Sequence, residues 1–490
     1  MKLKKIICLL LAIISLLSLN VIANAEDKCV TVTANDTSTS YSSFEEAWNK
    51  AVELGKTSEV TFILNKNWKG DGSGILGSGS GFSNGALTYS GKNNLTIDLN
   101  GYTIDRNLFK SKDGGAVIYV KSQMTIIDSR KDEYTVSKLF KGGTIENGAN
   151  DERGGGIVIS DNSTLNFNGG TILNCVSTDD GGAISIVGSG AKLIVNGGSF
   201  YGNRTYEASG ECCGGAIYSD EATVKISNST FEGNYAEDNG GAIYADDGTV
   251  SITDSIFYSN SSLEEGGAIF ADGDVKTTIT NCTFSDNSST GDDGGAIYCD
   301  SGEGTYLNNC QMFYNYSGSE GGAVFINDDK VFVLGGDYQY NTAKDNGGGI
   351  YVDSMNDINV SGKLIVKNNT VSSNENDICL QDGTASTAYL YCGGLYEGSA
   401  VYLCSNSKSS HLVIKGIDKF QYNNYIHFDS GFTLSKTNQS TLSSDNTRAV
   451  ASAIGDGSVV FICIAFVFII FIAIIFMLIT KKKKGARTDG

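Results

Sequence analysis

The sequence predicts an all-β protein, a right-handed parallel β-helix whose short strands wind into stacked coils. The motif GG[AG][IV] recurs, mostly at steps of 26 to 28 residues, and short stretches of alternating apolar and polar residues lie between its copies. Internal repeats of this length are typical of stacked architectures, and alternation with period two is typical of strands. A leucine-rich repeat has a similar period, but its L-x-x-L-x-L-x-x-N frame is absent. The copies start at residues 114, 154, 181, 214, 240, 266, 294, 321 and 347.

A second mark accompanies the glycines, because an aromatic or apolar residue lies three positions before an asparagine in successive repeats. Coils of equal length place equivalent residues on top of one another, about 4.8 Å apart. We therefore expect the first residues to form an interior stack and the asparagines to form a hydrogen-bonded ladder. The glycine pairs suit a tight corner, since glycine adopts positive φ and lacks a Cβ. The pairs are Phe200/Asn203, Phe231/Asn234, Phe257/Asn260, Phe284/Asn287, Met312/Asn315 and Tyr338/Asn341.

Both ends of such a stack expose strand edges and need caps. Residues 43–54, SFEEAWNKAVEL, predict an N-terminal capping helix, because Ser43 and Glu46 have the spacing of a capping box and the apolar residues share one face. The runs at 60–64 and 95–104 predict the first coils. The repeat fades after residue 374, so we assign 26–375 to the β-helix with its N-terminal cap and 376–434 to a β-rich C-terminal cap.

The two ends of the chain predict a surface location. Residues 1–25 have a basic start, an apolar run and a small-residue site at Ala25, as in a secretory signal peptide; an N-terminal membrane anchor is the alternative. Residues 459–479 are uncharged, and a helix of this length spans about 31 Å, so we expect one transmembrane helix at 458–480 rather than a buried soluble helix.

Four lysines follow the apolar run at 481–484, which places the tail 481–490 in the cytoplasm. Residues 435–457, rich in Ser, Thr and Asn, would form a stalk. The chain is thus expected to be a single-pass type I protein of the cell membrane with an extracellular ectodomain. Its formal net charge of −19 argues against nucleic acid as a partner and is compatible with divalent cations or basic partners.

The paired marks GGA[IV] and F-x-x-N resemble the repeat of the chlamydial polymorphic membrane proteins and of related surface proteins in trichomonad-like parasitic protists. GGAI at 181–184, 214–217, 240–243, 266–269 and 294–297 carries the resemblance, which covers about residues 100–375. It implies a surface-exposed β-helix that acts in adhesion, without catalytic residues to carry over. This chain departs from the chlamydial pattern in ending with one apolar segment, which favours a eukaryotic-type surface protein.

Acidic residues gather just before the glycine pairs. Stacked carboxylates repel one another unless they are bridged, and calcium takes several carboxylate oxygens, so these residues are a candidate Ca²⁺-binding stripe. The alternative is a solvated acidic turn face, and the strict nonapeptide calcium repeat is missing. The candidate ligands are Asp179, Asp180, Asp238, Glu264, Glu265, Asp292 and Asp293.

Cys282 and Cys310 occupy the same position in adjacent repeats, which predicts either a disulfide between coils or two buried thiols. Several N-x-[ST] sequons allow a glycoprotein. The candidate acceptors are Asn203, Asn228, Asn260, Asn281 and Asn287.

We therefore expect a non-enzymatic adhesion or recognition protein that binds a ligand on a host cell or a neighbouring cell through an extended β-helix face. Two alternatives remain open. One is a membrane-tethered polysaccharide lyase or hydrolase, although its paired carboxylates recur around the turn as a structural feature would. The other is a structural coat protein of the cell surface.

Overall fold

All described residues of the computed structural model belong to one compact unit, Met1–Ser443. The described residues are 28–74, 76–83, 85–108, 114–133, 141–206, 212–327, 330–353, 357–380, 388–404, 412–416 and 419–428. The predicted signal peptide, stalk, transmembrane segment and tail lie outside them. The unit is a right-handed parallel β-solenoid of about eleven coils, as the repeat predicts.

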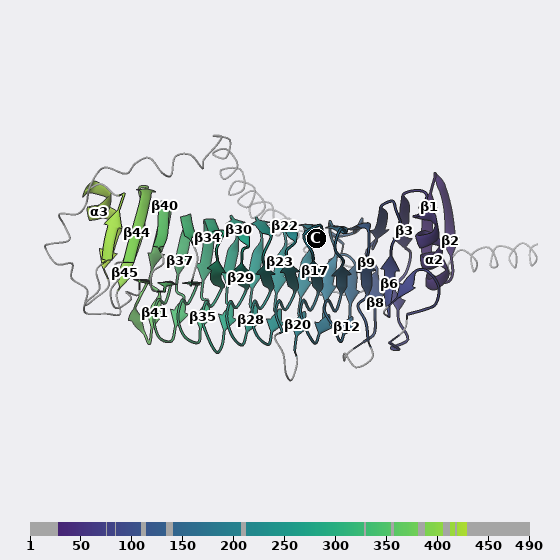
Figure 1. Ribbon diagram of the computed structural model, residues 1–490, viewed down its shortest axis with the longest axis horizontal. Helices are drawn as coiled ribbons and strands as arrows, with labels where there is room; N and C mark the ends of the chain where they lie inside the picture. The colour runs from purple at the N-terminus through teal and green to yellow at the C-terminus, as the bar shows by residue number, and fades with distance from the viewer. Residues whose placement is uncertain are drawn as a thin grey trace, which may run out of the picture. The chain divides into compact units, whose positions relative to one another are not determined.

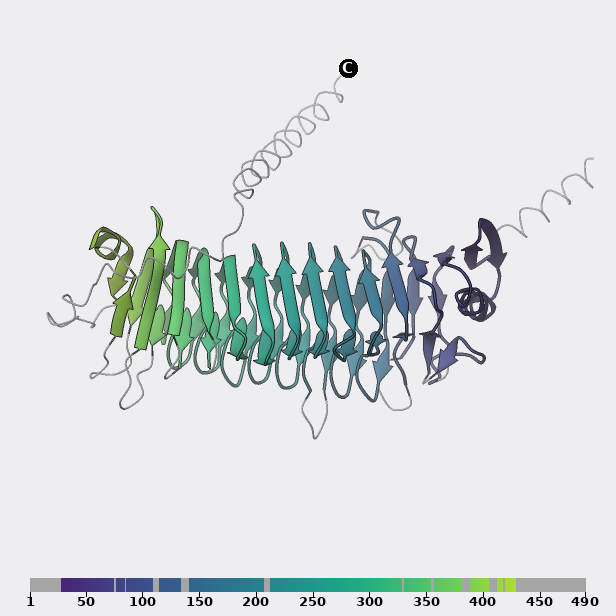
Figure 2. The same ribbon diagram turned by 45° about the horizontal axis from the view of Figure 1, so that its top comes forward.

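Each coil contributes three strands to three parallel ladders, so that the strands of one ladder lie side by side along the solenoid (Figure 2). The first ladder follows the glycine pairs and contains β6 (Ala86–Tyr89), β9 (Ile118–Val120), β13 (Ile157–Ile159), β17 (Ile184–Val187), β21 (Ile217–Asp220), β25 (Ile243–Asp246), β29 (Ile269–Gly273), β33 (Ile297–Ser301), β36 (Val324–Ile326), β39 (Ile350–Val352) and β43 (Ile378–Leu380).

The second ladder contains β3 (Val60–Leu64), β7 (Leu95–Asp98), β10 (Gln123–Ile127), β14 (Thr164–Phe167), β18 (Lys192–Asn196), β22 (Thr223–Ser227), β26 (Thr249–Thr253), β30 (Lys276–Thr280), β34 (Thr305–Phe313), β37 (Val331–Gln339), β40 (Asp357–Lys367), β44 (Ala388–Leu395) and β46 (Leu412–Lys415). The third ladder contains β4 (Trp68–Lys69), β8 (Thr103–Asp105), β11 (Thr144–Glu146), β15 (Thr171–Leu173), β19 (Ser199–Tyr201), β23 (Thr230–Glu232), β27 (Ile256–Tyr258), β31 (Thr283–Ser285), the second halves of β34, β37 and β40, β45 (Ala400–Cys404) and β47 (Ile426–Phe428).

A fourth ladder of two-residue strands, which the sequence pattern did not predict, follows the asparagines (Figure 1). It contains β12 (Ala149–Asn150), β16 (Val176–Ser177), β20 (Arg204–Thr205), β24 (Tyr235–Ala236), β28 (Ser261–Ser262), β32 (Ser288–Ser289), β35 (Tyr316–Ser317), β38 (Thr342–Ala343), β41 (Thr370–Val371) and β42 (Asn374–Glu375). The remaining elements are β1 (Val30–Ala34), β2 (Thr37–Tyr41), α2 (Phe44–Leu54), β5 (Phe82–Ser83) and α3 (Lys419–Tyr425).

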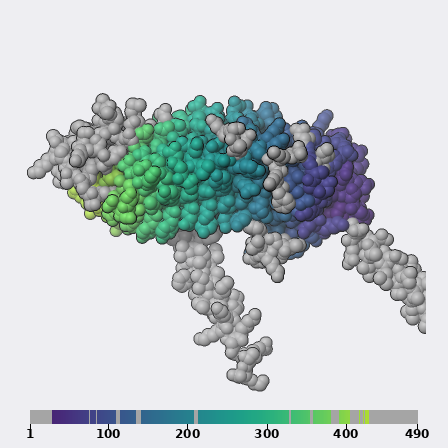
Figure 3. Space-filling view, turned by 90° about the horizontal axis from the view of Figure 1, so that it is seen from below, coloured from purple at the N-terminus to yellow at the C-terminus, as the bar shows by residue number. Residues whose placement is uncertain are grey.

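The interior stack is confirmed. Phe200, Phe231, Phe257 and Phe284 are fully buried, and their ring centroids lie 4.6 to 4.8 Å apart with planes within 5° of parallel. Spacing of this size is that of neighbouring strands, so the stack follows directly from the coil pitch. The successive coils form a continuous surface in the space-filling view (Figure 3).

The asparagine ladder is confirmed as well. The side-chain amide of Asn260 donates to Oδ1 of Asn287 at 3.0 Å and to the backbone oxygen of Phe231 at 3.0 Å. Its Oδ1 accepts from the backbone N–H and the side-chain amide of Asn234 at 3.1 and 2.9 Å. Buried amides need such partners, and the one-coil repeat supplies both a donor and an acceptor.

The two glycines of each pair have different roles. Gly240 has φ of 65°, which an L residue rarely adopts. A Cβ on Gly241 would collide with the carbonyl oxygen of Gly267 in the next coil. The first glycine therefore sets the turn, and the second lets two coils approach.

Helix α2 begins where the sequence predicts, with the Ser43 side chain accepting from the Glu46 backbone N–H at 3.2 Å. Its buried side chains, Trp48 among them, join the same core as the coils, and the Trp48 indole stacks edge-on against Phe62 of β3 at 5.4 Å. At the other end the parallel ladders continue beyond residue 375, because β44 pairs with β40 and β46, and β45 pairs with β43 and β47.

Candidate recognition surfaces

The first ladder turns one row of side chains away from the core. We call this row the outer row; its residue in each coil follows the inward-facing isoleucine or valine. Six of its members carry rings that form a stack with centroids 4.7 to 5.5 Å apart and planes within 23° of parallel. Most of these rings are buried and belong to a second apolar cluster, separate from the core. The ring-bearing residues are Tyr218, Tyr244, Phe270, Tyr298, Phe325 and Tyr351.

Carboxylates follow the rings two residues later in the same strands. Asp220, Asp246, Asp272 and Asp300 lie in register in neighbouring coils. The Tyr244 hydroxyl donates to Oδ2 of Asp272 at 2.6 Å. Burial, then the charges of Asp272 and other neighbouring carboxylates, raise the pKa of Asp246 to about 6. Like charges one coil apart therefore add to burial in disfavouring the ionised form of Asp246.

The predicted calcium stripe lies on the other side of the rings, before the glycine pairs. Its carboxylates accept from backbone N–H groups: Asp180 from Cys213 at 3.1 Å, and Asp238 from Cys212. Within the residues that the structure describes, no three His, Cys, Asp or Glu side chains converge into a group that could hold a metal ion. Some of the oxygens that calcium would need thus already accept hydrogen bonds within the turns, and calcium binding by the stripe stays a prediction. The stripe comprises Asp179, Asp180, Asp238, Glu264, Glu265, Asp292 and Asp293.

Two carboxyls of the stripe have pKa values well above their ordinary range. Burial, then the charge of Asp292, raise the pKa of Glu265 to about 7. Burial also raises the pKa of Asp293 to about 7, although its Oδ1 accepts from the Glu320 backbone N–H at 2.8 Å. At neutral pH this edge therefore carries less negative charge than its composition implies.

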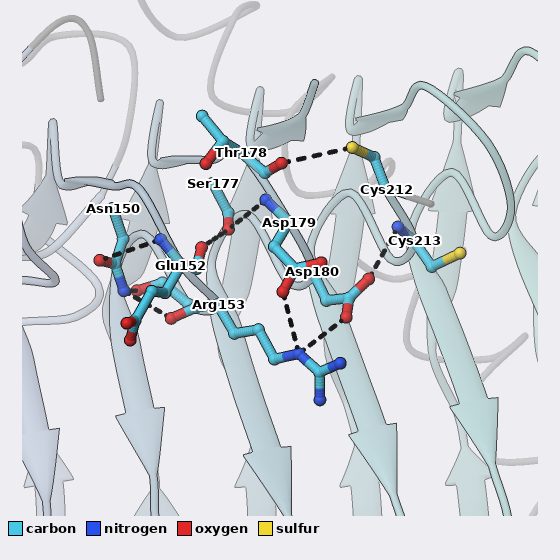
Figure 4. A network of polar contacts seen from close by, with 10 residues as sticks. Asn150, Glu152, Arg153, Ser177, Thr178, Asp179, Asp180, Cys212 and Cys213 are labelled. Carbon is cyan, nitrogen blue, oxygen red and sulfur yellow. Dashed lines mark hydrogen bonds and ion pairs between the residues drawn. The ribbon is translucent and has the colours of Figure 1, made fainter. Parts of the chain in front are cut away.

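Arg153 forms the centre of a polar network at this edge (Figure 4). Its Nε lies 3.2 Å from Oδ2 of Asp179 and 3.0 Å from Oδ2 of Asp180, one coil further on. Its Cζ lies 4.9 Å from the ring centroid of Tyr218. The two terminal nitrogens point away from both carboxylates in Figure 4. The guanidinium is thus fixed by two ion pairs and by stacking on a ring.

A groove of about 650 Å³ opens beside this network. The outer row passes through it as Tyr119, Val158 and Ser185, so two coils lack the ring that later coils carry. Pockets of this volume are large enough for an organic ligand or a few side chains. Its lining residues are Ala86, Ala116, Tyr119, Asn150, Glu152, Arg153, Val158, Ile159, Ser160, Asp161, Asp179, Ser185 and Val187.

A second surface lies where the third ladder turns into the fourth. Tyr314 is 60% exposed and Tyr340 is 48% exposed, and their rings stack at 5.5 Å. Both have positive φ, 59° and 60°, at a corner where other coils use Gly202, Gly233 or Asn368. A bulky residue in this conformation is strained, so the exposed rings are held at a cost to stability. Further large apolar side chains are exposed nearby: Ile256 and Tyr258 of β27, Leu263 directly after β28, and Tyr316 of β35.

Three of the predicted glycosylation sites are wrong. Asn203, Asn260 and Asn287 are fully buried members of the asparagine ladder, so their amides are inaccessible in the folded chain. The sequon pattern and the F-x-x-N pattern overlap at these positions, and the ladder accounts for them. Asn228 and Asn281 are exposed, and their glycosylation stays a prediction.

Cys282 and Cys310 occupy equivalent places in adjacent coils, as expected, but both are buried free thiols and the predicted disulfide is not formed. Cys282 Sγ donates to the backbone oxygen of Thr280 at 3.3 Å, and Cys310 Sγ to that of Asn308 at 3.6 Å. Side chains stacked in register point the same way, whereas a disulfide needs Cβ atoms that approach one another. Burial raises the pKa of the Cys282 thiol to about 12.

Both surfaces contain residues that the repeat analysis missed. The ring after GGA[IV] is visible in the sequence at Tyr218 and Tyr244, and its loss at Val158 and Ser185 is visible too. The exposed tyrosines stand one place before the ladder asparagine. In each case the residue that marks the surface departs from the repeat. An analysis that looks only for residues shared between repeats therefore misses it.

Comparison with known proteins supports the fold. Residues 214–393 match the family model described as a right-handed beta helix region. No curated protein and no solved structure matches the chain. Among the described residues, none of the helices has the length and apolar character needed to cross a bilayer.

Proposed function

We propose that this protein is a cell-surface recognition protein that binds a ligand on another cell through one long face of the β-helix. The exposed tyrosines Tyr314 and Tyr340 carry this proposal. Tyrosine supplies a large, rigid contact area and is enriched in binding hot spots. Here it replaces the small or polar residues that the same corner uses in other coils, such as Gly233, Asp286 and Asn368.

The neighbouring coils extend the same surface. Ile256 and Tyr258 are 47% and 42% exposed on β27, and Tyr316 is 42% exposed on β35. Solvent-exposed large apolar groups gathered on one side of a protein are typical of interaction sites. A solenoid adds such surface coil by coil without needing a new core.

The surface location is part of the proposal and is supported by the sequence. The leader-like residues 1–25 and the uncharged run 459–479 with its following lysines suit a type I membrane protein. Helix α2 would then shield the membrane-distal end of the stack, since its apolar face packs on β3. The resemblance to adhesion proteins built on the same repeat favours the same role.

The test is to express the full chain, tagged at both ends of the mature protein, on a non-adherent cell line. Antibody staining of intact and permeabilised cells establishes which tag is outside. Binding of the expressing cells to a panel of host and neighbouring cell types is then measured against cells that carry an unrelated β-helix. Saturable binding above that control supports the proposal. An outside tag with no binding to any cell type contradicts it and favours the coat protein; a polyuronate-degrading activity would favour the enzyme.

A further inference from the structure

The groove beside Arg153 is a place where the outer row lacks two rings. Tyr119 and Tyr218 lie three coils apart, with Val158 and Ser185 between them. Neighbouring strands are about 4.8 Å apart, so the two rings are separated by roughly 14 Å. From Tyr218 to Tyr351 each coil fills its place in the row with a ring. The gap therefore has room for two planar groups at the spacing of the stack.

One of these places is already filled by Arg153. Its Cζ lies 4.9 Å from the Tyr218 ring centroid, within the 4.7 to 5.5 Å ring-to-ring spacing of the row. Ser185 below it is only 2% exposed, although its own side chain is small. The other place, above Val158, lies between the Tyr119 ring and the guanidinium, and Val158 is accessible there. The Lys121 ammonium also lies over the Tyr119 ring, with Nζ 4.5 Å from the centroid.

The charge of the groove selects among planar ligands. Arg153 is the one cation among the lining residues, and both of its carboxylate partners come from the stripe. Glu152 and Asp161 add negative charge at the rim without a salt bridge to Arg153. A ligand that carries a ring flanked by positive charges would place the ring between Tyr119 and the guanidinium, and its charges beside these carboxylates rather than beside Arg153 or Lys121.

We propose that the groove binds a peptide segment of another protein, in which an aromatic side chain enters the place above Val158 and flanking lysines or arginines meet the rim carboxylates. The inference stands apart from the proposed function, because the tyrosines Tyr314 and Tyr340 lie on a different ladder. Its test uses purified protein and does not depend on where the chain resides in the cell.

The experiment measures binding of the peptide acetyl-Lys-Lys-Trp-Lys-Lys-amide to the full chain in neutral detergent by calorimetry, with empty micelles as the blank. Two further peptides replace the Trp by Leu, or the four Lys by Glu. We expect saturable binding of the first peptide and at least tenfold weaker binding of each of the others. Equal binding of the Leu peptide would overturn the ring insertion, and equal binding of the Glu peptide would overturn the charge argument.

Two variants at one position test the site. Val158→Tyr fills the vacant place with a residue that the same row already carries, so it should fold, melt no lower than the parent and bind at least tenfold more weakly. Val158→Ala leaves the place open and should bind within threefold. A third variant, Arg153→Lys, keeps the charge but removes the planar stacking surface, and should weaken binding fivefold or more even if Val158→Tyr fails to fold. Unchanged binding in folded Val158→Tyr or in Arg153→Lys, or no binding of the first peptide, would refute the proposal.

Discussion

The asparagine ladder predicts that replacing Asn260 by alanine strongly destabilises the folded chain. In Asn260→Ala the backbone N–H and one amide N–H of Asn234 lose their acceptor, Oδ1 of Asn260, inside a fully buried position. Each buried donor left unsatisfied costs about 1–3 kcal/mol, so two cost about 2–6 kcal/mol. The free energy of unfolding should fall by this amount in urea titrations of the purified chain followed by circular dichroism, with the slope unchanged.

The matched control is Asn228→Asp, which also removes a sequon but lies on the surface. Its side-chain amide donates a hydrogen bond to Oδ1 of Asn196 at 3.2 Å, and Asp tolerates the positive φ of this position. Its effect should stay within about 0.5 kcal/mol. A loss below about 1 kcal/mol in Asn260→Ala, or an equal loss in both variants, would refute the reasoning that the ladder is a fully satisfied buried network.

Three further predictions concern the core, the corner and pH. Phe257→Ala removes one ring from the interior stack and should lower the free energy of unfolding by about 3–5 kcal/mol in the same urea assay, whereas a loss near 1 kcal/mol would show a loosely packed stack. In Gly241→Ala the new Cβ collides with the next coil, so this variant should not fold at 37 °C. In Gly233→Ala the Cβ meets open space, but the residue has positive φ, so the free energy of unfolding should fall by about 1–2 kcal/mol. Equal expression and equal melting temperatures of the two variants would contradict the close approach of the coils at Gly241. Glu265 and Asp293 have pKa values of about 7 in the folded state, above their ordinary values. The folded chain therefore binds more protons than the unfolded chain between about pH 4 and 7. As a result, the melting temperature should fall as the pH rises from 5 to 8. Replacing both by their amides should flatten this slope, and a slope of opposite sign would contradict the assignment.

The coil could be predicted from the sequence because the same pattern of residues recurs in nearly every coil. A residue that recurs at one position, such as the phenylalanine or the asparagine, stacks on its own copy, so one periodicity determined the core, the ladder and the parallel strands together. The fourth ladder was missed because its strands, such as β28, are two residues long and show no alternation that a sequence pattern can reveal.

The sites were harder to predict because they depend on which atoms meet across coils. The acidic residues before the glycine pairs suggested a metal, yet the turn they occupy presents backbone N–H groups that use their oxygens, as at Asp180. The sequons at Asn203 and Asn260 are three-residue patterns that carry no information on burial. No motif in the sequence marks Arg153, and only the stacking of the coils brings its guanidinium over the Tyr218 ring.

The most direct test of the recognition face is a comparison of binding by cells that display the parent chain, the double variant Tyr314→Gly/Tyr340→Gly and the control Tyr396→Gly. Glycine already occupies the same corner as Gly202 and Gly233, with φ of 60° and 62°, so the double variant should fold and be at least as stable as the parent. Tyr396 is 64% exposed outside this surface and matches the change in chemistry. The account predicts that binding falls at least tenfold in the double variant and stays within twofold in the control. Equal binding by all three, at equal surface expression, would contradict it.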